Sequence, residues 1–530
     1  MSTPPATAVP SKGILGWIER VGNRLPDPVF LFLYLIGGLI AVSLLAAGLD
    51  WSAFHPTATG EDGAPLVIAA ESLLSAANIQ RLWVEMPTTF THFHPLGYVL
   101  VVMLGAGVAE RTGLFGTAMR AAVRNAPVSI LTPVVALVAM MGNLAADAAY
   151  VVLIPLAAVI YHAAGRHPIA GIAASFAGVS GGFSANLLPG QLDALLFGIT
   201  QEAVETIVPT WEANIAGNWY FIAAMVVVSI PVIWYVTDKI IEPRLGTYTG
   251  DGVVEDGDLE DEPATNDEIT AAERTGLRRA GLACLAVIGV WALFTLGPGT
   301  PLIDEAATPE ARLSPFYRSL VAGFFVLFLA AGWAYGAAVG VVTSHRDIVK
   351  MMAGAMEDLA YYLVLAFAAA HFVAMFNWSN LGLIVAVHGA NGLEQMALPT
   401  PLLLMLIVLF TVVINLFVGS ASAKWALLAP VLVPMLMLVG ISPEMTTAAY
   451  RVGDGASNII TPLMVYFPLI LIFCQRWVKG FGLGSLAALM VPYSFGLLAV
   501  GLALVGLWVA FEIPLGPGAT VEYVLPASAP

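Results

Sequence analysis

The chain has 530 residues, of which 59% are hydrophobic and only 11% are charged, against roughly 25% charged residues in an ordinary soluble domain. Its mean hydropathy is +0.85 and its formal net charge is −15. This composition excludes a soluble enzyme, a disordered chain and a nucleic-acid-binding protein, and it predicts an all-α polytopic membrane protein. An outer-membrane barrel is also excluded, because the apolar runs are continuous rather than alternating.

Apolar segments follow one another along the chain and are the candidate membrane elements. They lie near 27–49, 94–110, 127–142, 147–163, 168–200, 218–237, 278–297, 316–342, 357–390, 400–418, 423–440, 444–474 and 485–511. The pairs 127–163 and 400–440 each consist of two short halves joined by a polar kink. Each pair is either two spans or one re-entrant hairpin. With two re-entrant hairpins, nine transmembrane helices remain.

The distribution of basic residues favours the hairpins. If the N-terminus is cytoplasmic, 16 of the 21 basic residues lie on the cytoplasmic side and 3 lie outside, in agreement with the positive-inside rule. Lys424 and Arg451 fall at membrane depth. The acidic run 251–273 is poor in apolar residues and is predicted to be a flexible cytoplasmic linker. This topology places the C-terminus outside.

Similar polar positions recur in the two halves of the chain. Asn143 lies 43 residues before Asn186, and Asn415 lies 43 residues before Asn458. In the predicted topology, each hairpin is followed by a broken span, and the two sets have opposite orientations. This pattern predicts an inverted-topology repeat, which is typical of secondary transporters, with broken helices meeting at the midplane. The N-termini of such helices favour anionic groups.

At these residues the chain resembles the AbgT family of p-aminobenzoyl-glutamate transporters, which includes drug-efflux members. The resemblance rests on WIERVGNRLPDPVFLFL (17–33), SGGFSANLLPGQLDALLFGIT (180–200), NLFVGSASAKWALLAPVLVPM (415–435) and AAYRVGDGASNIITPLM (448–464). It covers most of the chain, apart from the linker 245–275 and the tail 512–530. It implies a homodimer with nine transmembrane helices and two re-entrant helical hairpins per protomer. It also implies ion-coupled transport of folate-precursor compounds, or export of sulfonamide antimetabolites.

The resemblance also implies a division of the chain and a set of functional residues. The division is 1–26 cytoplasmic N-terminus, 27–126 scaffold helices, 127–244 first repeat, 245–276 acidic cytoplasmic linker, 277–356 scaffold helices, 357–482 second repeat, 483–511 last transmembrane helix and 512–530 external tail. The family's functional positions fall on Asp193, Ser422, Trp425, Pro443, Arg451 and Asp454.

The charged residues at membrane depth allow two interpretations. Arg451 and Asp454 are three residues apart and share a helix face, so they either neutralise each other or act separately. In the second case Asp454 takes a proton or a cation and Arg451 binds a substrate carboxylate, because charges at this depth are costly and usually functional. Asp193 is either a proton-exchanging group or a hydrogen-bonded structural residue. Asp147 either lines the site or caps a helix. Lys424 meets a carboxylate or, by preference, snorkels outward.

The neutral candidates are amides, hydroxyls and one ring. Asn143, Asn186, Asn415 and Asn458 either hold a sodium ion through their oxygens or cap broken helices. Trp425 either stacks on an aminobenzoyl ring or anchors the hairpin. The predicted substrate-binding set is Asn143, Ser184, Asn186, Asp193, Ser420, Ser422, Trp425, Pro443, Arg451, Asp454 and Asn458. The predicted ion-coupling set is Asp193, Asp454, Asn143, Asn186, Asn415 and Asn458.

These expectations define a secondary active transporter of the bacterial inner membrane. Its partners would be a small anionic aromatic substrate, the lipid bilayer and a second copy of the chain, with no nucleic acid. No cofactor is expected beyond a bound sodium ion or a coupled proton. The alternative is a sodium- or proton-coupled di- or tricarboxylate transporter. The sequence leaves the direction of transport and the coupling ion open.

Overall fold

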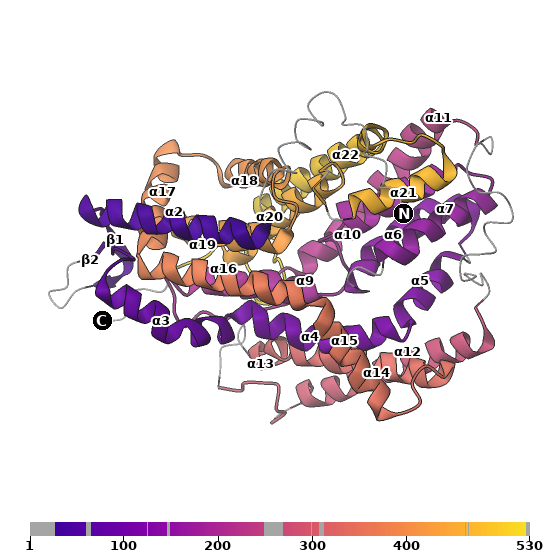
Figure 1. The fold of residues 1–530 in the computed structure, drawn as a ribbon, viewed down its shortest axis with the longest axis horizontal. Coiled ribbons are helices and arrows are strands. Elements are labelled where there is room, and N and C mark those ends of the chain that lie inside the picture. The colour runs from indigo at the N-terminus through magenta and orange to yellow at the C-terminus, as the bar shows by residue number, and fades with distance from the viewer. Residues whose placement is uncertain are drawn as a thin grey trace, which may run out of the picture.

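The computed structural model describes residues 27–59, 65–124, 126–145, 149–248, 269–297, 299–306, 312–461, 463–464 and 466–525. Within this part of the chain, eight helices are long and apolar enough to cross a membrane (Figure 1). They are Pro28–Gly48 (α2), Ala76–Arg111 (α3 and α4), Trp219–Leu245 (α10 and α11), Ala271–Thr295 (α12), Leu320–Val339 (α14), Ala360–Trp378 (α16), Ala421–Leu438 (α19) and Leu483–Ala510 (α22). The all-α membrane class is therefore confirmed.

Seven of these helices fall on predicted spans, and the eighth, α19, is the second arm of the second predicted hairpin. The remaining long elements are α5 (Leu114–Arg124), α6 (Leu131–Met141), α7 (Ile154–Ala163), α8 (Pro168–Phe176), α9 (Gln191–Val204), α15 (His345–Asp358), α17 (Leu381–Met396), α18 (Thr400–Asn415), α20 (Pro443–Asn458) and α21 (Phe467–Trp477). The short elements are α13 (Ser314–Arg318), β1 (Ser52–Thr59), β2 (Pro65–Ala69), the 3₁₀ turns Val128–Ile130 and Gly142–Ala145, and the π-helical turns Ala149–Leu153, Ala177–Gly181 and Val236–Ile241.

Two features differ from the sequence predictions. An antiparallel pair, β1 and β2, follows α2 although no strand was expected. The span predicted at 357–390 is divided at Asn380, whose φ of 57° ends α16 and starts α17. The two differences share a cause, because the Asn380 amide donates to the Ala69 carbonyl at 2.9 Å and fixes the turn against β2.

The predicted broken spans are both interrupted. The first runs through α8 and its π-helical end, becomes irregular, and resumes as α9; the second runs from α20 through an irregular stretch to α21. The two cross closely, since a Cβ on Gly455 would lie 2.9 Å from the carbonyl oxygen of Gly181. Glycine is required at this crossing because the backbones leave no room for a side chain.

Hydrogen bonds at matching positions support the internal repeat. The side-chain amide of Asn143 donates to the carbonyl oxygen of Gly182 at 3.4 Å, 39 residues further on. The amide of Asn415 donates to the carbonyl oxygen of Asp454 at 3.0 Å, also 39 residues further on. Each predicted hairpin is thus tied to the broken span that follows it, and the ties are equivalent. The number of crossings and their orientation remain predictions.

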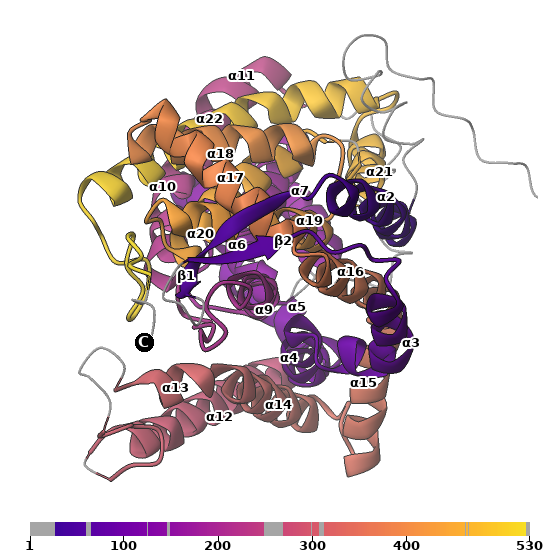
Figure 2. The same cartoon turned by 90° about the vertical axis from the view of Figure 1, so that its left-hand side faces the viewer.

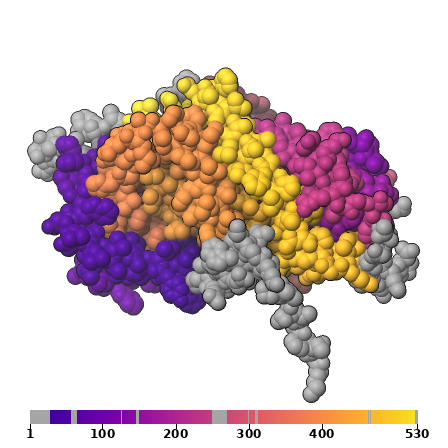
Figure 3. Space-filling model, turned by 90° about the horizontal axis from the view of Figure 1, so that it is seen from above, coloured from indigo at the N-terminus to yellow at the C-terminus, as the bar shows by residue number. Residues whose placement is uncertain are grey.

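The helices form layers around separate apolar cores. α12 and α14 pack beside α4 as a layer apart from the other helices (Figure 2). From above, α22 runs as a diagonal yellow band between helices of the second half, in orange, and helices of the first half, in magenta (Figure 3). The C-terminal segment returns to the start of α20, where the Ser442 N–H donates to the Val521 carbonyl at 2.9 Å. The broken spans and hairpin tips are thereby enclosed between the layers.

Candidate functional site

Lys424 and Asp454 form a buried ion pair between the second hairpin and the second broken span. Lys424 lies in the first turn of α19, and its Nζ is 2.5 Å from Oδ1 of Asp454 in α20. The exposed fractions of the two side chains are 0% and 1%. The prediction that Lys424 snorkels outward is therefore wrong. If the Lys424 side chain extended to solvent, the Asp454 carboxylate would stay buried without a counter-charge. The free-energy cost of that unpaired charge exceeds the cost of burying the ion pair.

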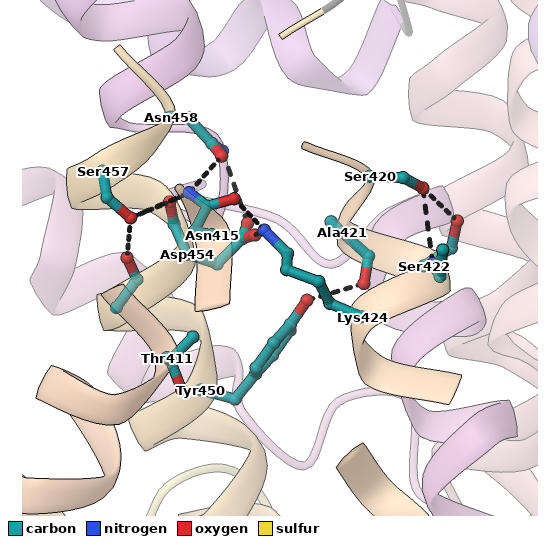
Figure 4. Close-up of polar contacts among 12 residues, drawn as sticks. Thr411, Asn415, Ser420, Ala421, Ser422, Lys424, Tyr450, Asp454, Ser457 and Asn458 are labelled. Carbon is teal, nitrogen blue, oxygen red and sulfur yellow. Dashed lines mark hydrogen bonds and ion pairs between the residues drawn. The ribbon is translucent and has the colours of Figure 1, made fainter. Parts of the chain in front are cut away.

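Asn415 joins this pair to the end of α20 (Figure 4). Its side-chain oxygen accepts a hydrogen bond from the Lys424 ammonium. Its amide nitrogen lies 2.8 Å from both Ser457 Oγ and Asn458 Oδ1, and the Asn458 amide lies 3.4 Å from Asp454 Oδ2. The hairpin tip and the break in α20 therefore share one polar network, as the sequence predicted for Asn415 and Asn458.

Arg451 pairs with Asp193, not with Asp454. Its Nη2 lies 2.7 Å from Asp193 Oδ1, and both side chains are almost fully buried. The other carboxylate oxygen accepts the backbone N–H of Gly190 at 2.7 Å, which caps α9. The interpretation in which Arg451 and Asp454 neutralise each other is therefore wrong, because each residue has a partner on another element.

Trp425 is a packing residue in this conformation. Its ring is 0% exposed and lies 4.4 Å from the ring of Tyr450, measured between centroids. Its Nε1–H lies 3.0 Å from Thr200 Oγ1 and 3.2 Å from the Leu196 carbonyl oxygen. The second hairpin is thereby fixed to α9 of the first half. Trp425 is not among the residues that line the cavity described below, and its stacking on a substrate ring stays a prediction.

The other predicted residues are dispersed around this core. Asn186 is buried, and its amide lies 3.4 Å from the Met140 carbonyl oxygen at the first hairpin. Ser184 is buried next to it in the irregular stretch. Pro443 begins α20, at the opposite end of that helix from Asn458. Asp147 lies outside the described residues. Among the described residues, a hydrogen bond joins Asn415 to Asn458, whereas Asn143 and Asn186 bond to backbone carbonyls of Gly182 and Met140.

A cavity of about 450 Å³ lies beside the two ion pairs. The predicted residues that line it are Asn143, Ser420, Ser422 and Asn458, and the further lining residues are Val99, Tyr150, Phe183, Gln191, Leu192, Leu195, Leu359, Tyr362, Gly419, Ala421, Met464 and Tyr466. Its surface is mostly apolar and aromatic, with a few convergent polar groups, as in small-molecule sites generally. No Lys, Arg, Asp or Glu side chain is among these described lining residues.

The first turns of two helices reach the cavity. α9 contributes Gln191 and Leu192, and α19 contributes Ser420 and Ser422. Ser420 caps α19 by accepting the Ala423 N–H at 3.3 Å, and its hydroxyl lies 3.2 Å from that of Ser422. Helix N-termini carry partial positive charge, so this end of the cavity favours an anion even without an exposed basic side chain.

Two polar atoms on the cavity wall have no hydrogen-bond partner among the described residues. They are the hydroxyl of Tyr362 and Oδ1 of Asn143. Buried polar atoms are almost always paired, so unpaired ones beside a cavity are candidates for contact with a ligand. Sequence reasoning named Asn143 but missed Tyr362, because a Tyr in a predicted span carries no local signal that it faces a cavity.

Comparison with known proteins agrees with this architecture. The AbgT transporter family model matches residues 13–523, and thus extends over the linker and most of the tail that seemed to lie outside the resemblance. The p-aminobenzoyl-glutamate transport protein of Escherichia coli (strain K12) is 35% identical over 518 residues, covering 98% of each chain.

Two solved structures have the same fold. The YdaH transporter of Alcanivorax borkumensis has a TM-score of 0.84 at 41% identity and covers 93% of this chain and 100% of its own. MtrF of Neisseria gonorrhoeae, described as illuminating a class of antimetabolite efflux pumps, has a TM-score of 0.87 at 41% identity, with 96% and 100% covered. These relatives give no support to the di- or tricarboxylate alternative. The chain is a multi-pass transporter, not an enzyme, and it belongs to the AbgT transporter family.

Proposed function

We propose that the chain is an ion-coupled secondary active transporter of p-aminobenzoyl-glutamate or related folate-pathway compounds, including export of sulfonamide antimetabolites. The observation that carries the proposal is the cavity, in which aromatic rings adjoin two helix N-termini. An anionic aromatic molecule needs both features. Its ring gains from stacking on tyrosine and phenylalanine, and its carboxylate gains from the serine hydroxyls and the positive end of the α19 dipole.

In this proposal the aromatic part of the substrate lies against Tyr150 and Tyr466. Their rings are stacked with centroids 4.3 Å apart and planes 12° apart, so they present a flat surface at the cavity wall. The carboxylates lie toward Ser420 and Ser422 at the start of α19. The Tyr362 hydroxyl donates to the substrate, which gives this unpaired group a partner.

The ion pair of Asp193 and Arg451 provides a means of coupling. A proton on Asp193 would neutralise its carboxylate and release the Arg451 guanidinium, whose Nε has no partner among the described residues. The guanidinium could then bind a substrate carboxylate through its planar fork. The carboxylates of the substrate and of Asp193 therefore compete for the Arg451 guanidinium, and protonation of Asp193 favours the substrate.

The proposal includes an oligomeric state and an orientation in the membrane. The chain forms a homodimer in the bacterial inner membrane, with its N-terminus cytoplasmic and its C-terminus external. Support comes from the distribution of basic residues and from α12, whose apolar face, including Leu282, Leu285 and Leu293, is exposed in the single protomer.

The test is flux of labelled p-aminobenzoyl-glutamate in proteoliposomes. A pH gradient and a sodium gradient are imposed separately on wild type, Asp193→Asn, Ser422→Ala and Ser175→Ala. Ser422 lines the cavity, whereas Ser175 is buried in α8 and bonds only within its own helix, so it is the matched control. One gradient should drive wild-type flux, and Asp193→Asn, which cannot exchange a proton, should abolish that dependence. Ser422→Ala should raise KM, whereas Ser175→Ala should not. The substrate assignment fails if neither gradient moves the compound through folded protein.

A further inference from the structure

The ammonium group of Lys424 occupies a set of oxygens that would otherwise suit a metal cation. Nζ contacts Oδ1 of Asn415 and Oδ1 of Asp454, at the point where the second hairpin meets the break in α20. Sodium prefers several hard oxygen ligands, and amide and carboxylate oxygens are of this kind. In the structure these oxygens bind the ammonium group of Lys424 instead (Figure 4).

The first half of the chain has no such cation. Asn143 and Asn415 are 272 residues apart, as are Asn186 and Asn458, and the equivalent amide bonds to Gly182 and Asp454 keep the same offset. This offset pairs Lys424 with Val152 and Asp454 with Gly182. The Oδ1 of Asn143 accordingly has no partner among the described residues. The Lys424–Asp454 ion pair therefore occurs at the second hairpin and has no counterpart at the equivalent positions of the first repeat.

The position of Lys424 suits a structural cation. It lies four residues after the Ser420 cap, so a shift of the hairpin tip must either carry the ammonium with it or break its contacts. Both partners are on other elements, Asn415 at the end of α18 and Asp454 within α20. In this conformation the positive charge between the tip and α20 is that of Lys424.

We propose that the Lys424 ammonium takes the place of a coupling sodium ion at the second hairpin, so that the hairpin closes on α20 through a tethered cation. The residues predicted to bind sodium there do not fit a free ion while Lys424 is bound. This inference deepens the ion-coupling part of the proposed function and rests on it. It leaves sodium no role at the second hairpin of the natural protein.

The experiment measures the Tm of the purified, full-length protein in detergent while sodium chloride replaces potassium chloride at constant ionic strength. A ligand that binds only the folded state raises Tm in a saturable manner. In wild type, any difference between the two salts should be unaffected by Asn458→Ala. Lys424→Ala and the longer Lys424→Gln should lose stability and recover part of it saturably with sodium but not with potassium. Lys479→Ala, at an exposed lysine, is the matched control and should behave as wild type.

A further variant tests the ligand set. Lys424→Met combined with Asp454→Asn removes both charges, so it should show no response to sodium. The proposal is overturned if wild type itself shows a saturable, sodium-specific rise in Tm that Asn458→Ala abolishes. It is also overturned if Lys424→Ala or Lys424→Gln folds and ignores sodium. Because no substrate is present, these outcomes are independent of the flux experiment, and a wrong substrate would leave them unchanged.

Discussion

Neutralising Asp193 alone should destabilise the protein more than neutralising both members of its ion pair. Asp193→Asn keeps an acceptor for the Gly190 N–H but removes the negative charge 2.7 Å from Arg451. The guanidinium is 1% exposed, so water cannot replace the carboxylate. Leaving one buried charge unpaired costs about 3–5 kcal/mol in unfolding free energy. Asp454 offers little relief, because it already binds Lys424.

The assay is a double-mutant cycle on the unfolding free energy, followed by tryptophan fluorescence in detergent. Arg451→Met combined with Asp193→Asn removes both charges while keeping side-chain volume. It should therefore cost less than Asp193→Asn alone, with a coupling energy toward the upper end of roughly 0.5–3 kcal/mol. The control is Asp358→Asn, which breaks the 2.5 Å pair with Arg111 at the surface, where both partners are more than a third exposed. Loss of an exposed pair costs about 0–1 kcal/mol.

Two outcomes would refute this reasoning. One is a loss for Asp193→Asn no larger than that for Asp358→Asn, which would mean that water reaches Arg451 or that the guanidinium finds another anion. The other is a double variant whose loss equals the two single losses added together. That result would show that the two residues act independently, and the coupling mechanism through Asp193 would fall with it.

Three further changes test other parts of the structure. Trp425→Phe should cost about 0.5–1.5 kcal/mol of stability by removing the Nε1–H hydrogen bond to Thr200 and Leu196, which stay bonded to each other. It should leave the substrate KM unchanged, because Trp425 is not among the residues that line the 450 Å³ cavity, and a raised KM would contradict this. Gly455→Ala should cost about 1–3 kcal/mol in chemical unfolding, whereas Gly281→Ala, with open space at its Cβ, should not; equal effects would refute the close crossing. Burial lowers the pKa of His167 below its ordinary 6.5, so the unfolded chain binds more protons and stability should fall as pH drops below 6.5. His167→Asn should flatten the Tm between about pH 7.5 and about pH 5.5, and an unchanged slope would assign the effect to other groups.

Much of the site was predictable because local spacing governs it. Arg451 and Asp454 lie on one helix face, and Asn415 and Asn458 meet as their repeated spacing suggested. The partners of the charges were not predictable in this way. The sequence places two bases, Lys424 and Arg451, at membrane depth, and the structure pairs each with a buried acid. Which acid takes which base depends on helix packing, because Arg451 and Asp193 are 258 residues apart.

The sequence by itself determined that this is a helical membrane protein with long apolar spans, two broken spans and a repeated spacing of polar residues. These properties follow from the local composition and from the spacing of residues along the chain, which need no knowledge of how the helices pack. Only the tertiary structure decided that Lys424 turns inward, that Trp425 packs on Tyr450, and that Tyr362 reaches the cavity. Those outcomes depend on distances between elements far apart in the chain, and the relative free energies of alternative buried pairings set them.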